Sequence, residues 1–218
     1  MVFATYQLTG DEKIPSTVNL GKRSTPVWLQ QKWDTGEYRE FIRKNGCGHC
    51  CTAMALRLNG VDIDPHQEFS LCRQLWGEPQ KDREFPQDNL QSVAGITKII
   101  NRFGVKAEYF GVADLEDAEK HFDAALRGGK QIIFWSHPRS DFPENPFSKH
   151  EHYVMAVGYT EDGQVLVGNS SVNGTETGVH AVETATVIRA LYVGSQPVDM
   201  TWGERDRYAN CAGYVVVG

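Results

Sequence analysis

Apolar residues recur at the spacing of an amphipathic helix in much of the first half of the chain. Segments with this spacing are residues 48–58, 64–76, 89–103 and 114–126. The apolar stripe of the first segment consists of Cys51, Met54, Ala55 and Leu58. Asn59-Gly60 suits the end of that helix, and Asp64-Pro65 suits the start of the next one. The pattern predicts a helix in each of the four segments.

Shorter apolar or alternating runs, typical of strands, dominate the second half of the chain. The predicted strands cover residues 38–42, 105–110, 131–135, 152–159, 164–168 and 213–217. The turn formers Glu161-Asp162-Gly163 join two of these strands into a hairpin. Residues 182–192 have a helical pattern. Because most helices precede most strands, the predicted fold class is α+β, with an N-terminal helical lobe and a C-terminal lobe built on an antiparallel sheet.

Residues 1–26 have no clear periodicity and contain several turn formers, so we expect a loosely structured N-terminal arm. The remaining residues, 27–218, are enough for one domain with a sizeable core. Residues 77–88 are expected to form an exposed loop. The proline-rich residues 138–149 directly precede a candidate catalytic histidine, which makes them a candidate rim or lid. Whether the arm covers a cleft, as a propeptide would, stays open.

Composition narrows the functional classes. The 218 residues carry a formal net charge of −6 without a cluster of Lys and Arg, which argues against nucleic acid as a partner. No apolar run approaches eighteen residues, so no membrane span is expected. The N-terminus lacks the features of a secretory signal, which favours a cytoplasmic location. The five cysteines are odd in number, and three crowd at Cys47, Cys50 and Cys51, unlike a disulfide framework.

Cys47 is the candidate nucleophile. It lies between Gly46 and Gly48, directly before the first predicted helix. The free N–H groups and the positive end of the macrodipole at a helix N-terminus favour the thiolate form of a cysteine. The flanking glycines permit a sharp turn and a close approach of a substrate backbone. Cys51 lies in the apolar stripe and is expected to pack in the core.

His152 and Asn169 supply the other parts of a thiol hydrolase. His152 begins one strand of the predicted hairpin, and Asn169 follows the end of the other. Adjacent antiparallel strands lie about 5 Å apart, so the two side chains can be neighbours. A bond from Asn169 to one ring nitrogen would fix the tautomer and leave the other nitrogen facing the thiol. His150 is the competing histidine, but it falls in the polar loop and is expected to be solvated.

An attack on an amide carbonyl also needs donors for the oxyanion. The backbone N–H of Cys47 is one candidate. A side-chain amide is the other, from either Gln30 or Gln31 in a tryptophan-rich stretch. The alternative for each glutamine is an ordinary surface position.

A metal or redox site is the rival interpretation of the cysteine cluster. Cys47 and Cys50 have C-x-x-C spacing, with His49 between them and Cys51 adjacent. A structural zinc site usually needs a second ligand pair, whereas Cys72 and Cys211 stand alone in the sequence. A redox motif would need a thioredoxin-like βαβ opening, which the pattern does not predict. We therefore expect no metal and no organic cofactor.

Taken together, these residues resemble the papain-like clan of cysteine peptidases. More narrowly, they resemble its bacterial family related to double-glycine (bacteriocin-processing) leader peptidases. The matching positions are Leu29-Gln30, Gly46-Cys47-Gly48, Ala53-Met54, His152-Tyr153-Val154, Gly158-Tyr159 and Asn169. The resemblance implies a papain-like fold over residues 27–218. It also implies that Cys47 is the nucleophile, His152 the general base and acid, Asn169 the orienting residue, and Gln30 an oxyanion donor.

The sequence departs from the family pattern at several positions. His49 replaces the usual proline, and Cys50-Cys51 replaces a Thr-Ser pair. Glu151 stands where a glycine usually precedes the histidine, and Ser170 follows Asn169 where the family often has Asp-Pro. None of these changes removes a chemical role, but they indicate a distinct branch whose substrate need not be a leader peptide.

The sequence therefore predicts a cysteine-dependent hydrolase that cleaves a peptide or amide bond through an acyl-thioester on Cys47. An acyl transferase would use the same Cys-His-Asn site, because the acceptor is chosen by the cleft. A papain-like module that binds a peptide without cleaving it is the third possibility. The expected partner is a peptide or amide substrate, and the oligomeric state stays open.

Overall fold

The computed structural model describes residues 1–76, 92–112, 115–137, 141–171, 175–191 and 213–218. Its helices are α1 (Arg39–Asn45), α2 (Cys47–Leu58), α3 (Pro65–Trp76), α4 (Val93–Arg102), α5 (Leu115–Arg127) and α6 (Thr184–Ala190), with a short 3₁₀ helix η1 (Gln30–Lys32). Its strands are β1 (Ala4–Leu8), β2 (Ser16–Leu20), β3 (Arg23–Val27), β4 (Ala107–Phe110), β5 (Gln131–Ser136), β6 (His152–Tyr159), β7 (Val165–Gly168), β8 (Val179–Val182) and β9 (Tyr214–Val217). The chain is thus an α+β protein.

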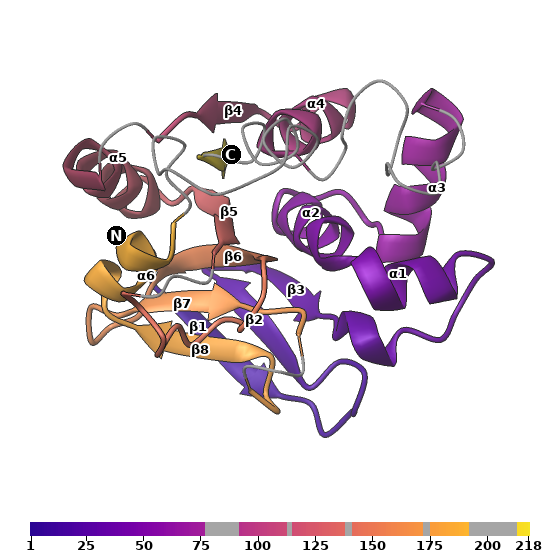
Figure 1. Ribbon diagram of the computed structural model, residues 1–218, viewed down its shortest axis with the longest axis horizontal. Helices are drawn as coiled ribbons and strands as arrows, with labels where there is room; N and C mark the ends of the chain where they lie inside the picture. The colour runs from indigo at the N-terminus through magenta and orange to yellow at the C-terminus, as the bar shows by residue number, and fades with distance from the viewer. Residues whose placement is uncertain (77–91, 113–114, 138–140, 172–174, 192–212) are drawn as a thin grey trace.

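Two antiparallel sheets form the framework (Figure 1). The larger sheet has the strand order β4-β9-β5-β6-β7-β8, and the smaller sheet has the order β1-β2-β3. Strand β9 lies between β4 and β5 and pairs with both of them in antiparallel orientation. β6 and β7 form the predicted hairpin, in which Tyr159 pairs with Val165.

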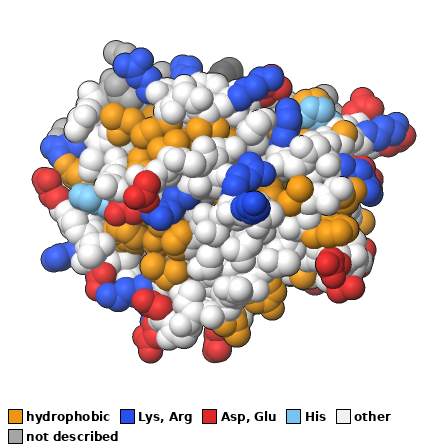
Figure 2. Space-filling view, turned by 180° about the vertical axis from the view of Figure 1, so that it is seen from behind, with side chains coloured by type: hydrophobic (Ala, Val, Ile, Leu, Met, Phe, Trp, Pro, Cys, Tyr) orange, Lys and Arg blue, Asp and Glu red, His pale blue; other side chains and the backbone are white. Residues whose placement is uncertain are grey.

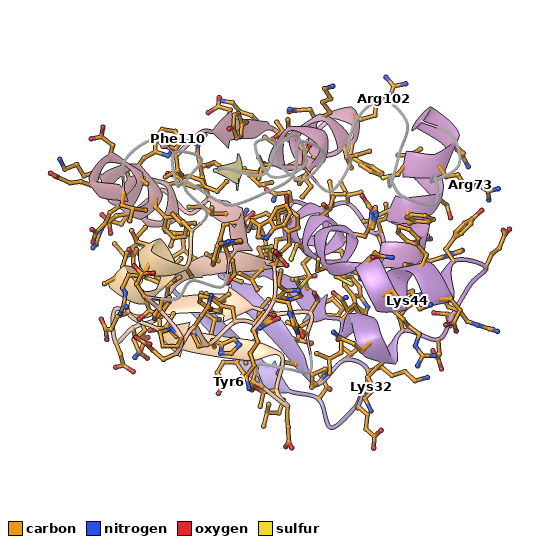
Figure 3. All side chains as sticks on the ribbon, in the orientation of Figure 1. Tyr6, Lys32, Lys44, Arg73, Arg102 and Phe110 are labelled. Carbon is orange, nitrogen blue, oxygen red and sulfur yellow. The ribbon has the colours of Figure 1, made fainter. Side chains whose placement is uncertain are left out.

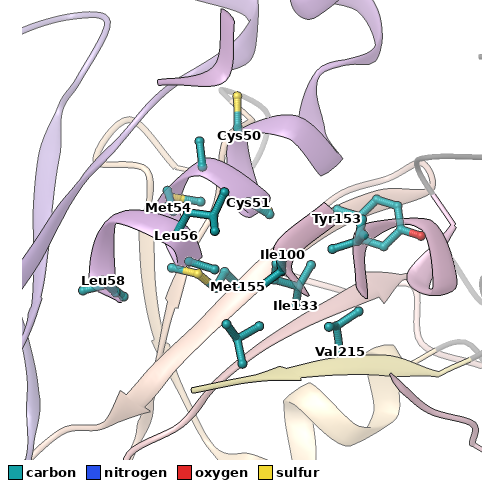
Figure 4. Packing of buried hydrophobic residues seen from close by; sticks show 14 of the residues in the cluster. Cys50, Cys51, Met54, Leu56, Leu58, Ile100, Ile133, Tyr153, Met155 and Val215 are labelled. Carbon is teal, nitrogen blue, oxygen red and sulfur yellow. The ribbon is translucent and has the colours of Figure 1, made fainter. Parts of the chain in front are cut away.

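Helix α2 contacts β3 of the smaller sheet and β6 of the larger sheet, and β1 and β2 also contact β6 directly. Apart from Cys47 and Arg57, all of its residues are buried. Figure 4 shows Met54 and Leu56 of this helix close to Met155 of β6. A helix that is enclosed in this way must be apolar around most of its circumference. Residues 50–56 are therefore apolar on all sides of the helix, apart from Thr52, and not only along one face.

The central strands of the larger sheet, β5, β6, β7 and β9, are buried on both faces. Along β6, the side chains of Tyr153, Met155 and Val157 join the core around α2, whereas Val154 and Ala156 join a second core. That second core is covered by α5 and α6. Because both faces are covered, every residue of β6 is buried, including His152 at its start.

Helices α1 and α3 flank α2 on the outside of the molecule. Lys44 of α1 and Arg73 of α3 point outward in Figure 3. The start of α3 has the predicted cap, in which the backbone N–H of Gln67 donates to Asp64 Oδ1 at 2.8 Å. Gly60, after the end of α2, has φ +87°, as the predicted left-handed end requires.

Most elements predicted from periodicity are confirmed, with bounds shifted by a few residues. They are α2, α3, α4, α5, β4, β5, the β6–β7 hairpin and β9. The predicted helix at 182–192 corresponds to α6, but its first residue belongs to β8, a strand that the sequence did not predict. The predicted loop at 77–88 lies outside the described residues.

The expectation of a loosely structured arm at residues 1–26 is wrong. Residues 4–27 form the smaller sheet, and Ala4, Val18 and Leu20 are buried in the core that surrounds α2. Each strand has five residues with polar side chains on one face, a pattern too short and too polar to stand out. β3 runs across the predicted boundary between residues 26 and 27, and the division into an arm and a domain stays a prediction.

The predicted strand at 38–42 is also wrong, because α1 begins at Arg39. Only Ile42 is fully buried in this seven-residue helix. A single buried position leaves no periodicity from which helix and strand could be distinguished.

Candidate active site

Cys47 is the first residue of α2, and Gly46 is its N-cap. Helix α1 ends at Asn45, so the chain turns from one helix into the next within a single residue. A Cβ atom on Gly46 would lie 2.4 Å from the carbonyl oxygen of Ile42, a distance that no other residue type can satisfy without a shift. Gly46 therefore permits the tight junction that places Cys47 at a helix N-terminus.

The described cysteines differ in exposure. Cys47 is half-buried, whereas Cys50, Cys51 and Cys72 are fully buried. Burial raises the pKa of the Cys50 and Cys51 thiols, because an ion there would lose its hydration. Among the described cysteines, Cys47 is therefore the one suited to react with a molecule from solution.

His152 begins β6 and pairs with Ser136 of β5. Its imidazole is 5% exposed, and Nε2 lies 2.8 Å from Asn169 Oδ1. The structure thus brings together the two residues that the sequence predicted from opposite ends of the hairpin. His150, the competing histidine, is exposed.

The carboxamide of Asn169 is held by four hydrogen bonds. Its Nδ2 donates to the carbonyl oxygen of Phe147 at 2.9 Å and to His180 Nε2 at 3.0 Å. Its Oδ1 accepts from His152 Nε2 and from the backbone N–H of Ser171 at 2.9 Å. The Phe147 carbonyl oxygen can only accept a hydrogen bond, and the Ser171 backbone N–H can only donate one. These two partners therefore determine that Oδ1 of the carboxamide faces His152.

This orientation fixes the tautomer of His152. Asn169 Oδ1 can only accept, so Nε2 of His152 carries the hydrogen and Nδ1 of the neutral ring is unprotonated. Burial lowers the pKa of His152 to about 4, and the bond to Asn169 opposes this shift only in part. Without a charged partner the imidazole is therefore neutral at pH 7, and Nδ1 is the ring nitrogen that can accept a proton.

His180 is a residue of this network that the sequence reasoning missed. It lies on β8, opposite Val167 of β7, and burial lowers its pKa to about 4. Because its Nε2 accepts from Asn169, its own hydrogen is on Nδ1. The only sequence signal was a histidine in a short strand after the hairpin, and β8 itself was not predicted.

Gln30 lies in η1 and is 5% exposed. Its backbone N–H donates to the carbonyl oxygen of Ser170 at 2.8 Å, and its Oε1 accepts from Ser170 Oγ at 3.3 Å. The residue that follows Asn169 therefore holds Gln30 and directs its Nε2 amide away from Ser170. Gln31 is half-buried, and its Nε2 is already bonded to Ser171 Oγ at 3.3 Å.

Helix α2, which begins with Cys47, packs against β6, the strand that begins with His152. His49, in contrast, points to α3, where it meets Glu68. The predicted metal alternative at Cys47, Cys50 and His49 is thus not a single cluster. The group of possible metal ligands found among the described residues is His49, Glu68 and Cys72.

The face of the molecule in Figure 2 carries Lys and Arg interspersed with Asp and Glu, and several hydrophobic areas between them. In the described part of the chain, no helix combines the length and the apolar character needed to cross a membrane.

Comparisons with known proteins give one family match. Residues 25–194 match the model of the Peptidase_C39 like family. Among solved structures, the chain is similar to one from Bacillus anthracis described as a C39-like peptidase, with 13% identity, a TM-score of 0.45, and coverage of 79% of this chain and 88% of the other. It is also similar to a double-glycine motif protease from an AMS/PCAT transporter in complex with the leader peptide, with 14% identity, a TM-score of 0.38, and coverage of 66% and 77%. Both TM-scores are low, so the family match carries the comparison. No curated protein matches the chain.

The lowered pKa of His152 predicts how stability depends on pH. An unfolded histidine binds a proton near pH 6.5 and His152 only near pH 4, so the free energy of unfolding falls as the pH falls through this window. The contribution is roughly 3 kcal/mol, at about 1.4 kcal/mol per pKa unit, and is constant below pH 4. Urea denaturation between pH 4 and 7.5 measures it. His152→Gln should remove about half of the total fall, because burial also lowers the pKa of His180 to about 4 and the share of His180 remains. His150→Gln, at an exposed site, should leave the fall unchanged. Equal curves for the two variants would refute the assignment.

Proposed function

The chain belongs to the Peptidase_C39 like family, and on this premise we propose that it is a cysteine peptidase that cleaves a peptide bond through a thioester on Cys47. The observation that carries the proposal is the fixed tautomer of His152. Asn169 holds the hydrogen on Nε2, which leaves Nδ1 as the base for a thiol. The proposed source of that thiol is Cys47, which is half-buried at the start of a helix that packs on β6.

In the proposed reaction, Cys47 Sγ attacks the carbonyl carbon of the substrate, and the thiol proton passes to His152 Nδ1. The C–N bond then breaks as His152 returns this proton to the leaving amine. A water molecule, deprotonated by His152, attacks the thioester, and the C–S bond breaks to release the acid. A thiolate on Cys47 would raise the pKa of His152, because the two groups share one proton.

Two donors are proposed for the oxyanion: the backbone N–H of Cys47 and Nε2 of Gln30. The support for Gln30 is its burial and its two hydrogen bonds to Ser170, which fix the amide without using Nε2. The Nε2 group of Gln31 already donates to Ser171 Oγ. A fixed donor costs no reorganisation in the transition state, so Gln30 is the better choice.

Three broader predictions from the sequence also belong to the proposal. They are a papain-like fold for the domain, a helical lobe that carries Cys47, and a sheet lobe that carries His152 and Asn169. The proposed substrate is a peptide with small residues near the cleaved bond. A cytoplasmic location is compatible with the free state of the described cysteines, because a reducing compartment keeps a nucleophilic thiol reduced.

Site-resolved alkylation tests the thiol and imidazole without a known substrate. With iodoacetamide at pH 4 to 10, we expect Cys47 to react below pH 7, while buried Cys50 and Cys51 serve as internal controls that do not react. His152→Ala should move the reaction of Cys47 toward the range of an ordinary thiol, near pH 8.5.

Digestion of a peptide library, read by mass spectrometry, tests turnover. Cys47→Ala and His152→Ala should each lower cleavage by about 10³-fold or more, whereas Cys51→Ala should retain it. Products linked to an added amine would indicate an acyl transferase. An ordinary Cys47 thiol together with no cleavage would leave the peptide-binding module as the function.

Matched glutamine variants test the oxyanion donor. Gln30→Ala should lower kcat for the most rapidly cleaved library peptide by about 10²- to 10³-fold, because one donor to the developing charge is lost. Gln31→Ala should change kcat little. The reverse order of effects would assign the donor to Gln31.

His180 is proposed as a positioning residue that acts through Asn169. Its Nε2 and the Phe147 carbonyl oxygen hold the two hydrogens of the Asn169 carboxamide, and thereby the orientation of Oδ1 toward His152. Without an acceptor at position 180, one amide hydrogen would be buried without a partner, at a cost of about 1–3 kcal/mol.

Two substitutions separate this role from simple packing. His180→Leu removes the acceptor and should lower kcat/KM by about 10- to 100-fold, the usual effect of losing a group that orients an imidazole. His180→Gln keeps an acceptor and should retain most of the activity. ¹⁵N NMR of His152 should report a single Nε2–H tautomer in the wild type and a mixture in His180→Leu. An unchanged tautomer in that variant would contradict the positioning role.

A further inference from the structure

A second cluster of ionisable side chains lies behind the candidate nucleophile, and the proposed reaction does not use it. His49 Nδ1 lies 2.5 Å from Glu68 Oε2, and Cys72 Sγ donates to Glu68 Oε1 at 3.2 Å. The ligand atoms of all three residues lie within 4.8 Å of one another. The exposed fraction is 2% for His49, 2% for Glu68 and 0% for Cys72.

The positions of the three residues are set by two helices that pack against each other. His49 lies in the first turn of α2, two residues after Cys47. Glu68 and Cys72 are four residues apart on α3, so they lie on one face of that helix, and this face meets α2. A pair of ligands at this spacing on one helix, completed by a residue of a second element, is a common way to build a metal site.

The surroundings of the cluster are apolar. The rings of Phe41 and Phe69 pack against His49, with centroids 6.2 and 5.0 Å from that of the imidazole. A carboxylate buried in such a place must be neutralised, either by a proton shared with the histidine or by a cation. Glu68 therefore offers a carboxyl group in an apolar site, beside a nitrogen donor and a sulfur donor.

We propose that His49, Glu68 and Cys72 form a site for Zn²⁺. One imidazole nitrogen, one carboxylate oxygen and one thiolate are a donor set that suits this borderline-soft ion and does not suit Mg²⁺ or Ca²⁺. Bonds of about 2.0–2.3 Å to a tetrahedral ion hold ligand atoms about 3.3–3.8 Å apart. The Cys72–Glu68 contact already approaches this separation, and the His49–Glu68 contact must open by about 1 Å to admit the ion.

On binding, the ion replaces the hydrogens that now join the three residues. Cys72 loses its thiol proton to solvent. The hydrogen between His49 Nδ1 and Glu68 Oε2 moves by exchange with solvent to Nε2 of the imidazole, so that Nδ1 and the carboxylate can each bind the metal. Water takes the fourth position, as in other sites with three protein ligands. The bound ion would then fix the first turn of α2 to α3, next to Cys47. This inference does not depend on the proposed peptidase activity.

Metal binding to the whole chain tests the proposal, in a Cys47→Ala background so that Cys47 and His152 cannot hold the ion. Equilibrium dialysis against ZnCl₂, followed by metal analysis, should give one Zn²⁺ per chain. Co²⁺ in place of Zn²⁺ should show the absorption band of a thiolate ligand. Cys72→Ser in this background should weaken binding by at least 100-fold, whereas Cys51→Ser, a buried cysteine outside the cluster, should retain it.

Two results would overturn the proposal. One is a Cys47→Ala protein that binds no Zn²⁺, and the other is equal binding by the Cys72→Ser and Cys51→Ser variants. In either case the three residues form a hydrogen-bonded network only. Circular dichroism without metal establishes that each variant folds. Should Cys72→Ser fail to fold, Glu68→Gln replaces it, and the same loss of binding and of the Co²⁺–thiolate band is expected.

Discussion

The arrangement of the candidate site depends on the hydrogen bonds of the Asn169 carboxamide. This carboxamide lies between β6, β8 and the segment that contains Phe147, and each of its four hydrogen-bonding positions is used. A buried amide is stable only when it is satisfied in this way. Because the partners on the backbone have fixed roles, the amide can face His152 in one orientation only. The tautomer of the neutral imidazole follows from that orientation, with the hydrogen on Nε2 and Nδ1 left as the acceptor.

The enclosure of α2 is the second constraint. Helix α2 is buried in contact with both sheets and carries functional candidates at its start and on the side that faces α3. Cys47 remains half-buried at the N-terminus, whereas His49 is turned toward α3 and Glu68. Figure 4 shows that Cys50 points away from Ile133 and Met155, while the middle of the helix packs toward the strands. A change in the packing of α2 against α3 would therefore also change the position of the first turn of α2.

The departures from the family pattern acquire physical reasons in the structure. Ser170, where the family often has proline, donates its hydroxyl to Gln30 and thereby connects η1 to the segment after β7. His49, in place of proline, supplies one partner of the buried carboxylate of Glu68. Glu151, in place of glycine, is exposed.

The sequence by itself determined the elements with strong periodicity and the types of residue at the candidate site. The stripe around Met54 predicts α2, the glycines around Cys47 predict its start, and the hairpin predicts that His152 and Asn169 are neighbours. These features are local, because each depends on residues within one helix or one pair of adjacent strands. The tertiary structure decided the rest: the packing of residues 4–27 as a sheet into the core that contains α2, the hydrogen bond between Ser170 and Gln30, and the contacts of Asn169 with His180 and of His49 with Glu68 and Cys72. Those contacts join segments whose spacing in the chain carries no signal, since short polar strands and single histidines gain their roles only from the partners that folding brings to them.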